Sequence, residues 1–232
     1  MKTSILGMVC LVCACSNSGG TPDPSDPGVD ASVNPPAVTR TLFINAEGVT
    51  LNAGADDAGA NTSSIMTTTT TVSPYLAADP QRATKIAAIV GEVQSILAPY
   101  DIEITSTRPA TGMYEMIVLT DQKGKDFGLD GVISIIPTSC APKLSTIGLI
   151  FGEPIAQHAV VREIIQRFGS TGNVPSTSAP NDCMCDDSAC EWNLSGPCTI
   201  GGANTPVSEL EQCTQAQTID VHAEFLSTYG PA

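Results

Sequence analysis

Two segments of the chain have the apolar spacing of an amphipathic helix. Residues 79–100 read DPQRATKIAAIVGEVQSILAPY, in which Asp79 and Pro80 predict the first turn and Pro99 predicts the end. In residues 154–169, an apolar face recurs at intervals of three and four, with Gly169 as the expected stop. Each helix should therefore pack one face on a core. The apolar positions are Ile86, Ile89, Val90, Val93, Ile96 and Leu97 in the first helix, and Val161, Ile164, Ile165 and Phe168 in the second.

Alternating or continuous apolar runs predict five strands. They cover residues 40–49, 101–106, 114–120, 131–137 and 146–152. The polar stretch after the first strand, which includes five threonines at 67–71, is expected to form a long surface excursion. The order strand, helix, several strands, helix predicts an α+β fold, similar to α/β, with a twisted mixed sheet.

The first 15 residues have the pattern of an export signal. A basic Lys2 precedes a short apolar stretch that is too short for a stable membrane span. The sequence LVCAC at 11–15 resembles a bacterial lipobox, in which the last cysteine is acylated and becomes the first residue of the mature protein. Residues 1–14 are therefore expected to be a lipoprotein signal peptide and Cys15 a lipidation site. Ser16 after this cysteine favours the outer membrane. The alternative is a secretory signal with an incidental cysteine.

Residues 15–38 are rich in Pro, Gly, Ser and Asp, and have almost nothing to bury. Such a composition predicts a disordered tether. The net charge of the whole chain is −14, which disfavours nucleic acid as a partner because the phosphates would be repelled. The expected partner is the membrane, through the lipid on Cys15.

Six cysteines lie beyond the signal segment, and in an exported chain they predict three disulfides of undetermined pairing. They are Cys140, Cys183, Cys185, Cys190, Cys198 and Cys213. A zinc site among them is the less favoured alternative, because the spacing is not that of paired CxxC motifs. Four acidic residues nearby suggest a calcium loop only faintly and are expected to be solvated: Asp182, Asp186, Asp187 and Glu191.

The second helix also resembles an enzyme motif. Its sequence VVREIIQRFGSTG, in this order of elements, is similar to the metzincin zinc proteases, and more closely to the bacterial matrixin-like group, whose motif is HExxHxxGxxH. The resemblance covers residues 40–184. It implies a metzincin-like domain at 39–180, with residues 181–232 as its cysteine-rich C-terminal part. It also implies a twisted sheet with one antiparallel edge strand beside the second helix.

The residues that match the motif are few. Glu163 aligns with the general-base glutamate, Gly169 with the glycine, and Met184 with the methionine of the Met-turn. The three zinc-binding histidines are replaced by Arg162, Gln166 and Gly172. The resemblance therefore implies a former active site whose ligands are missing.

Zinc is expected to be absent. The chain has only two histidines, His158 and His222, so three histidine ligands cannot be assembled. A guanidinium at position 162 would repel a divalent cation. Without a metal, Glu163 is expected to be a solvated carboxylate, paired with Arg167 one turn later.

These patterns favour a catalytically inactive, metzincin-like surface lipoprotein that binds a protein or peptide in its cleft or serves as a scaffold. Arg162 and Gln166 are expected to line the cleft or the surface, or Arg162 to pair with an acid in the former metal volume. Two alternatives remain open. One is a hydrolase with an unrecognised site that uses Glu163; the other is a disulfide-stapled envelope protein unrelated to proteases.

Overall fold

The structure is a computed structural model that describes residues 40–137, 143–152, 156–172, 174–185, 196–202, 205–207 and 217–232. All of these residues belong to one compact unit, Ala37–Ala232. The expected signal peptide, the tether and Cys15 lie outside the described residues, as do Cys140, Cys190 and Cys213.

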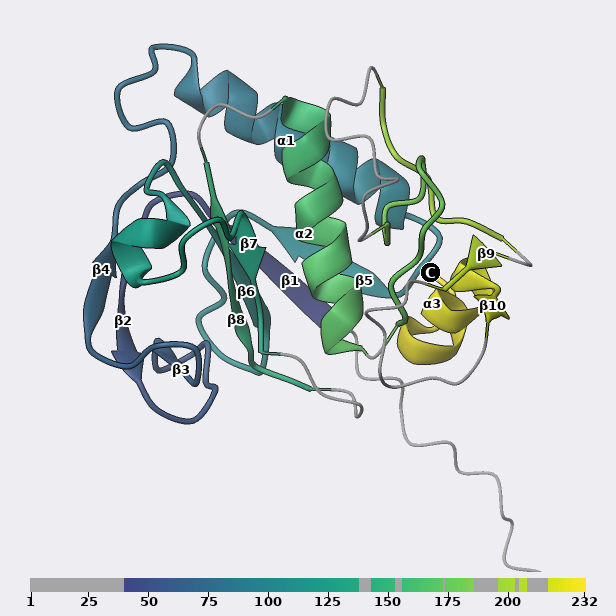
Figure 1. Ribbon diagram of the computed structural model, residues 1–232, viewed down its shortest axis with the longest axis horizontal. Coiled ribbons are helices and arrows are strands. Elements are labelled where there is room, and N and C mark those ends of the chain that lie inside the picture. The colour runs from purple at the N-terminus through teal and green to yellow at the C-terminus, as the bar shows by residue number, and fades with distance from the viewer. Residues whose placement is uncertain are drawn as a thin grey trace, which may run out of the picture. The chain divides into compact units, whose positions relative to one another are not determined.

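A five-stranded mixed sheet forms the centre of this unit (Figure 1). In spatial order it consists of β5 (Ile102–Thr105), β1 (Arg40–Asn45), β6 (Glu115–Thr120), β8 (Ile147–Phe151) and β7 (Ser134–Ile135). The first four strands are parallel, whereas β7 is antiparallel to β8. The prediction of an α+β fold with a mixed sheet is confirmed, and the single antiparallel strand lies at the edge.

Both predicted helices are present with shifted ends. α1 spans Arg82–Leu97; Asp79 lies before it and accepts a hydrogen bond from the Gln81 amide at 2.7 Å. α2 spans Gln157–Thr171. The prediction that Gly169 ends this helix is wrong, because the helix continues for two more residues and Gly172 is its C-cap.

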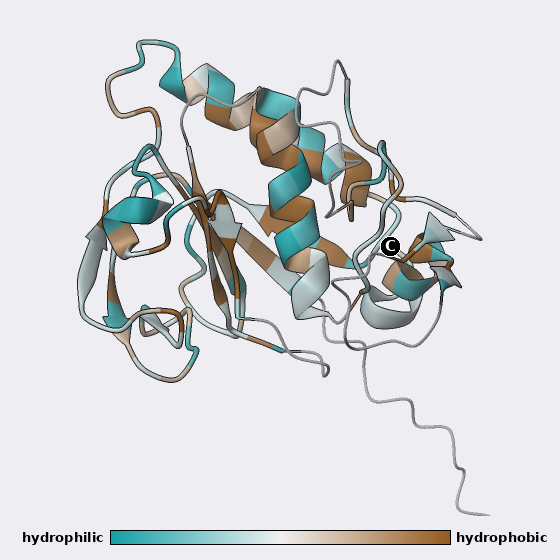
Figure 2. Ribbon diagram, in the orientation of Figure 1, coloured by the Kyte–Doolittle hydropathy of each residue, from teal (hydrophilic) through white to brown (hydrophobic). Residues whose placement is uncertain are grey.

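The side chains of the strands alternate between two cores. On one face, Leu42, Ile44 and Ile117 pack with apolar residues of α1, α2 and a third helix, α3 (Val221–Tyr229). On the other face, Phe43 and Val118 belong to a second apolar cluster. Figure 2 shows the consequence as apolar strands beneath helices that carry both apolar and polar bands. The alternation is the two-residue period of β-strands.

The second cluster is covered by a structure that the sequence did not predict. Within the stretch expected to be a surface excursion, β2 (Val49–Ala53) pairs with β3 (Thr62–Ser63) and β4 (Thr70–Val72). Leu51 and Val72 from this small sheet are buried against the main sheet. A short 3-10 helix, η1 (Gly124–Phe127), borders the same cluster through Phe127.

The C-terminal part contributes β9 (Thr205–Pro206) and β10 (Thr218–Ile219), which form an antiparallel pair, and then α3. The Asp220 side chain caps α3 by accepting a hydrogen bond from the Ala223 amide at 3.0 Å. Val221, Phe225 and Tyr229 are buried and join the core under α2. Among the described residues, no helix has the length and apolar character needed to cross a bilayer.

Candidate functional site

The polar face of α2 is the surprising feature of this structure. Arg162, Glu163 and Gln166 each have 0% exposed surface, although their face of the helix is polar in sequence. The expectation that Glu163 is solvated is therefore wrong, and so is a surface role for Arg162 and Gln166. Segment 174–185 supplies backbone acceptors to this face, so the polar groups lie inside the protein.

Arg162 points toward segment 174–185. Its Nη2 donates a hydrogen bond to the Pro180 carbonyl, and its charge acts on the carboxylate of Asp182, which is also buried. Burial raises the pKa of Asp182, while hydrogen bonds from the Met184 and Gly201 amides and the charge of Arg162 oppose the increase. Asp182 is thus an acid on which the charge of Arg162 acts, and the expectation that Asp182 is solvated is wrong.

Gln166 lies one turn further along the same face. Its amide nitrogen donates to the Cys185 carbonyl at 3.0 Å, and its side-chain oxygen accepts from Arg167 Nη2 at 2.9 Å. Arg162 and Gln166 therefore connect α2 to both ends of the stretch 180–185. Each buried amide or guanidinium contact satisfies polar groups that would otherwise be costly to remove from water.

Glu163 faces the sheet. Its Oε2 accepts a hydrogen bond from the hydroxyl of Ser134 in the edge strand β7, and lies 3.6 Å from Arg167 Nε. The predicted pairing of Glu163 with Arg167 is confirmed. Because the carboxylate is fully buried, it has no exposed surface at which a substrate could reach it.

Gly169 and Met184, two residues that match the metzincin motif, are in contact. A Cβ atom at position 169 would lie 2.7 Å from Met184 Sδ and 3.1 Å from Phe225 Cζ. The glycine is thus needed for close packing of the Met184 side chain and α3 on the helix.

Gly172, at the third expected ligand position, is also closely covered. A Cβ atom there would overlap the Tyr229 hydroxyl and lie 2.7 Å from Thr228 Cγ2. Tyr229 is fixed by stacking on Phe168 with ring centroids 4.9 Å apart. A side chain at position 172 would therefore meet α3.

The side chains of the two histidines have partners outside the aligned motif positions. His158 Nδ1 is 2.6 Å from Glu92 Oε1 of α1, and His222 Nδ1 is 2.7 Å from the Tyr100 hydroxyl. Within the described ranges, no three His, Cys, Asp or Glu side chains are grouped to hold a metal. The buried positive charge of the Arg162 guanidinium would also repel a metal cation placed next to it. The described residues at the aligned ligand positions, Arg162, Gln166 and Gly172, do not fit a zinc ion.

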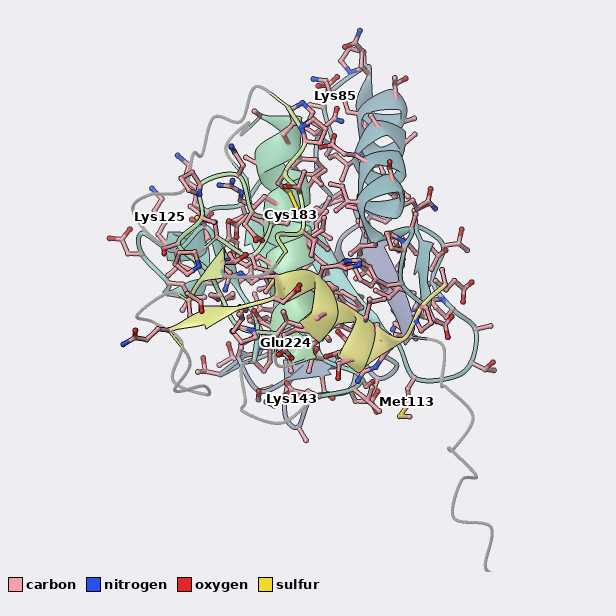
Figure 3. All side chains as sticks on the ribbon, turned by 90° about the vertical axis from the view of Figure 1, so that its right-hand side faces the viewer. Lys85, Met113, Lys125, Lys143, Cys183 and Glu224 are labelled. Carbon is pink, nitrogen blue, oxygen red and sulfur yellow. A yellow bond between two sulfur atoms is a disulfide. The ribbon has the colours of Figure 1, made fainter. Side chains whose placement is uncertain are left out.

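One disulfide is described completely. Cys183 is bonded to Cys198, and the two belong to the same core as α2. Figure 3 shows this yellow sulfur bond at Cys183. Cys185 is disulfide-bonded as well. The predicted use of these cysteines in disulfides is thus confirmed for Cys183, Cys185 and Cys198.

Several partners in the site were missed by sequence reasoning. Ser134 is 29 positions from Glu163, and Asp182 is 20 positions from Arg162, so no local pattern links them. Tyr229 was missed because α3 was missed, although Asp220 followed by Val221, Phe225 and Tyr229 is a recognisable capped helix pattern.

Comparisons with known proteins give a distant likeness in structure, and none in sequence. No protein-family model matches the chain, and no curated protein matches its sequence. Among solved structures, it is similar to archaemetzincin from Methanopyrus kandleri, with 12% sequence identity and a TM-score of 0.36 over 70% of this chain and 92% of that one. A TM-score this low carries no argument about function.

Proposed function

We propose that this chain is a metzincin-like protein without peptidase activity, in which the place of the metal ligands has become part of the core. The complete burial of Arg162, Glu163 and Gln166 carries this proposal. The antiparallel edge strand β7 beside α2, and the contact of Gly169 with Met184, support the metzincin relationship.

We propose a role in binding or as a scaffold in place of hydrolysis. Metal-dependent hydrolysis requires an open coordination position and a base that reaches water. Here the positions aligned with the metal ligands hold Arg162, Gln166 and Gly172. Glu163, which aligns with the base, accepts a hydrogen bond from Ser134. The alternative of a hydrolase that uses Glu163 needs a carboxylate that substrate can reach, which a fully buried side chain does not provide.

The first experiment is zinc content by mass spectrometry on the full chain carrying Cys15→Ser, so that no lipid is attached. Export into an oxidising compartment and purification without chelator should give less than about 0.1 zinc per chain. A matched assay of peptide cleavage, with and without added zinc, should show no turnover. One zinc per chain would contradict the proposal, as would turnover that Glu163→Gln abolishes.

The double variant Arg162→His/Gln166→His tests the metzincin relationship itself. It places two imidazoles one turn apart on either side of Glu163, and we expect it to gain zinc binding that wild-type protein lacks. Gly172→His is left out because that side chain would strike Tyr229. A folded double variant with no affinity for zinc would speak against a former metal site.

A further inference from the structure

Two of the three large apolar side chains that are exposed in the described part of the chain lie at one end of the main sheet. Met113 has 63% of its surface exposed and Leu144 has 43%. Met113 precedes β6 and Leu144 precedes β8, and these neighbouring strands are parallel, so both residues lie at the amino-terminal end of the sheet. Figure 3 shows Met113 and Lys143, the residue before Leu144, at the lower end of the view. The third, Ile133, lies at the opposite end, because its carbonyl accepts a hydrogen bond from the amide of Phe151, the last residue of β8.

The first strand of the sheet begins beside these two side chains. β1 starts at Arg40 and is the parallel neighbour of β6. Arg40, Met113 and Leu144 line the same small cavity, which has a volume of about 20 Å³. The residues that connect the domain to the expected lipid site, Cys15, therefore join it at this apolar end of the sheet.

The loop at 106–113 presents Met113 without a negative charge. All of its residues except Pro109 are exposed. A Cβ atom at Gly112 would meet no atom within 4 Å beyond its chain neighbours. The loop contains one charged residue, Arg108, and no acid. It could therefore enter an apolar environment without the cost of removing a carboxylate from water.

Basic side chains lie next to the exposed apolar ones. Arg40 Nη1 donates a hydrogen bond to the Lys143 carbonyl at 3.1 Å, and Arg108 Nε donates to the Tyr114 hydroxyl at 2.9 Å. Such long side chains can keep their stems in apolar contact while their charged heads reach the polar groups of lipids. Lys143 Nζ lies 3.6 Å from Asp56, so part of this positive charge is already balanced. Because the whole chain also has a net charge of −14, a zwitterionic lipid surface fits this end better than an anionic one.

We propose that the amino-terminal end of the main sheet docks on a zwitterionic phospholipid bilayer, with Met113 and Leu144 inserted among the lipids. This docking depends on the lipid expected at Cys15 and does not depend on the absence of peptidase activity. A linker with the length and composition of residues 16–39 spans about 25–30 Å on average, less than the diameter of roughly 40 Å of a domain of this size. The attachment therefore favours contact through the end that carries Arg40. It also holds that end at an effective concentration of about millimolar, so a contact too weak to bind the free protein is enough.

The test attaches the chain to vesicles by a route that does not need acylation. A hexahistidine tag replaces residues 1–15 and binds a nickel-chelating lipid in phosphatidylcholine vesicles, and the compact unit Ala37–Ala232 is left intact. The readout is quenching of tryptophan fluorescence by bromine on the acyl chains. Met113→Trp and Leu144→Trp should each lose at least half of the fluorescence that the new tryptophan adds, relative to vesicles without bromine. The wild-type chain, with its single tryptophan, supplies the background.

Ile133→Trp is the matched control, because Ile133 is an exposed apolar residue at the opposite end of the sheet. It should lose less than about a tenth of its added fluorescence. Equal quenching at both ends, or quenching at neither, would overturn the proposal. So would a dimer, seen by sedimentation of the Cys15→Ser chain without vesicles, that Met113→Glu/Leu144→Glu dissolves, since a second copy would then cover this surface. Absence of lipid on Cys15 in cells would remove the anchor, and fatty-acid labelling detects that failure separately from the quenching result.

Discussion

At the scale of single residues, burial is decided by what folds over a side chain, and residue type is a weak guide to it. Arg162 and Gln166 lie on the polar face of an amphipathic helix, and the usual expectation is solvent exposure. In this molecule the chain returns over that face and supplies the Pro180 and Cys185 carbonyls as acceptors. The sequence could predict the apolar face of α2, but it could not predict that the opposite face is covered too.

Glycines show the same dependence on neighbours. Gly172→Ala should lower the free energy of unfolding by roughly 1–3 kcal/mol, because the added methyl group strikes the fixed ring of Tyr229. Gly91 in α1 is the matched control, since a Cβ atom there would meet no described neighbour beyond its own helix within 4 Å. Gly91→Ala should raise stability by about 0.5–1 kcal/mol through helix propensity alone. Urea denaturation followed by circular dichroism measures both, and equal effects would contradict this packing of Gly172 against α3.

Glu115 is another buried carboxyl group, at the start of β6. It forms an ion pair with Arg40 at 2.9 Å and accepts a hydrogen bond from Thr171. Burial is the main cause that raises its pKa from 4.5 to about 7, although Thr171 and Arg40 both act to lower it. The folded protein therefore holds a proton at a pH where the unfolded chain has released it.

The stability of the protein should consequently fall as pH rises from about 4.5 to 7. The protonated Glu115 carboxyl contributes roughly 3 kcal/mol to the free energy of unfolding at a pH below 4.5, its pKa in the unfolded chain. This contribution is lost as the pH rises to about 7, its pKa in the folded protein. Glu115→Gln, which cannot titrate, should flatten this slope. Urea denaturation at several pH values between 4.5 and 8 checks the expectation. A wild-type slope that the substitution leaves unchanged would assign the pH dependence to other groups.

At the scale of elements, the long strands and both long helices were predictable, because each carries its own period. β1, β6 and β8 supply alternating or continuous apolar side chains over five or six residues. β3 and β4 have two and three residues, so no period can be read from them. For that reason the sequence predicts only a surface excursion in their place.

The Cys183–Cys198 disulfide holds in place the segment that covers α2. Replacing both cysteines by alanine should lower the free energy of unfolding by about 3 kcal/mol, the value expected for a closed loop of this length. Amide hydrogen exchange should increase first in segment 174–185 and along α2. Faster exchange confined to the far face of the sheet, near β2, would contradict this role.

At the scale of the whole molecule, the sequence predicted the fold class correctly and identified α2 as the important helix. It did not predict the closed site, because that site is assembled from α2, β7 and segment 174–185, whose meeting depends on the complete fold. The N-terminal predictions concern residues 1–38, outside the described part.

We expect the chain to be lipidated at Cys15 and held in the envelope of the cell. In a bacterial host fed an alkyne fatty acid, the wild-type chain should be labelled and fractionate with membranes. Cys15→Ser should lose both properties, whereas Cys13→Ser, two residues earlier, should keep them. A label that persists in Cys15→Ser would refute the assignment of the lipid to this residue.

The burial of Arg162 has a consequence for any attempt to rebuild a metal site on α2. A single Arg162→His change would remove the buried guanidinium that donates to the Pro180 carbonyl, and leaving a buried polar group without its partner typically costs about 1–3 kcal/mol, and more for a charged group. The free energy of unfolding of a whole domain is only about 5–15 kcal/mol, so this one substitution could remove much of it. Under the function proposed above, regaining a metal site would therefore need several changes together, because the first of them alone would destabilise the closed core.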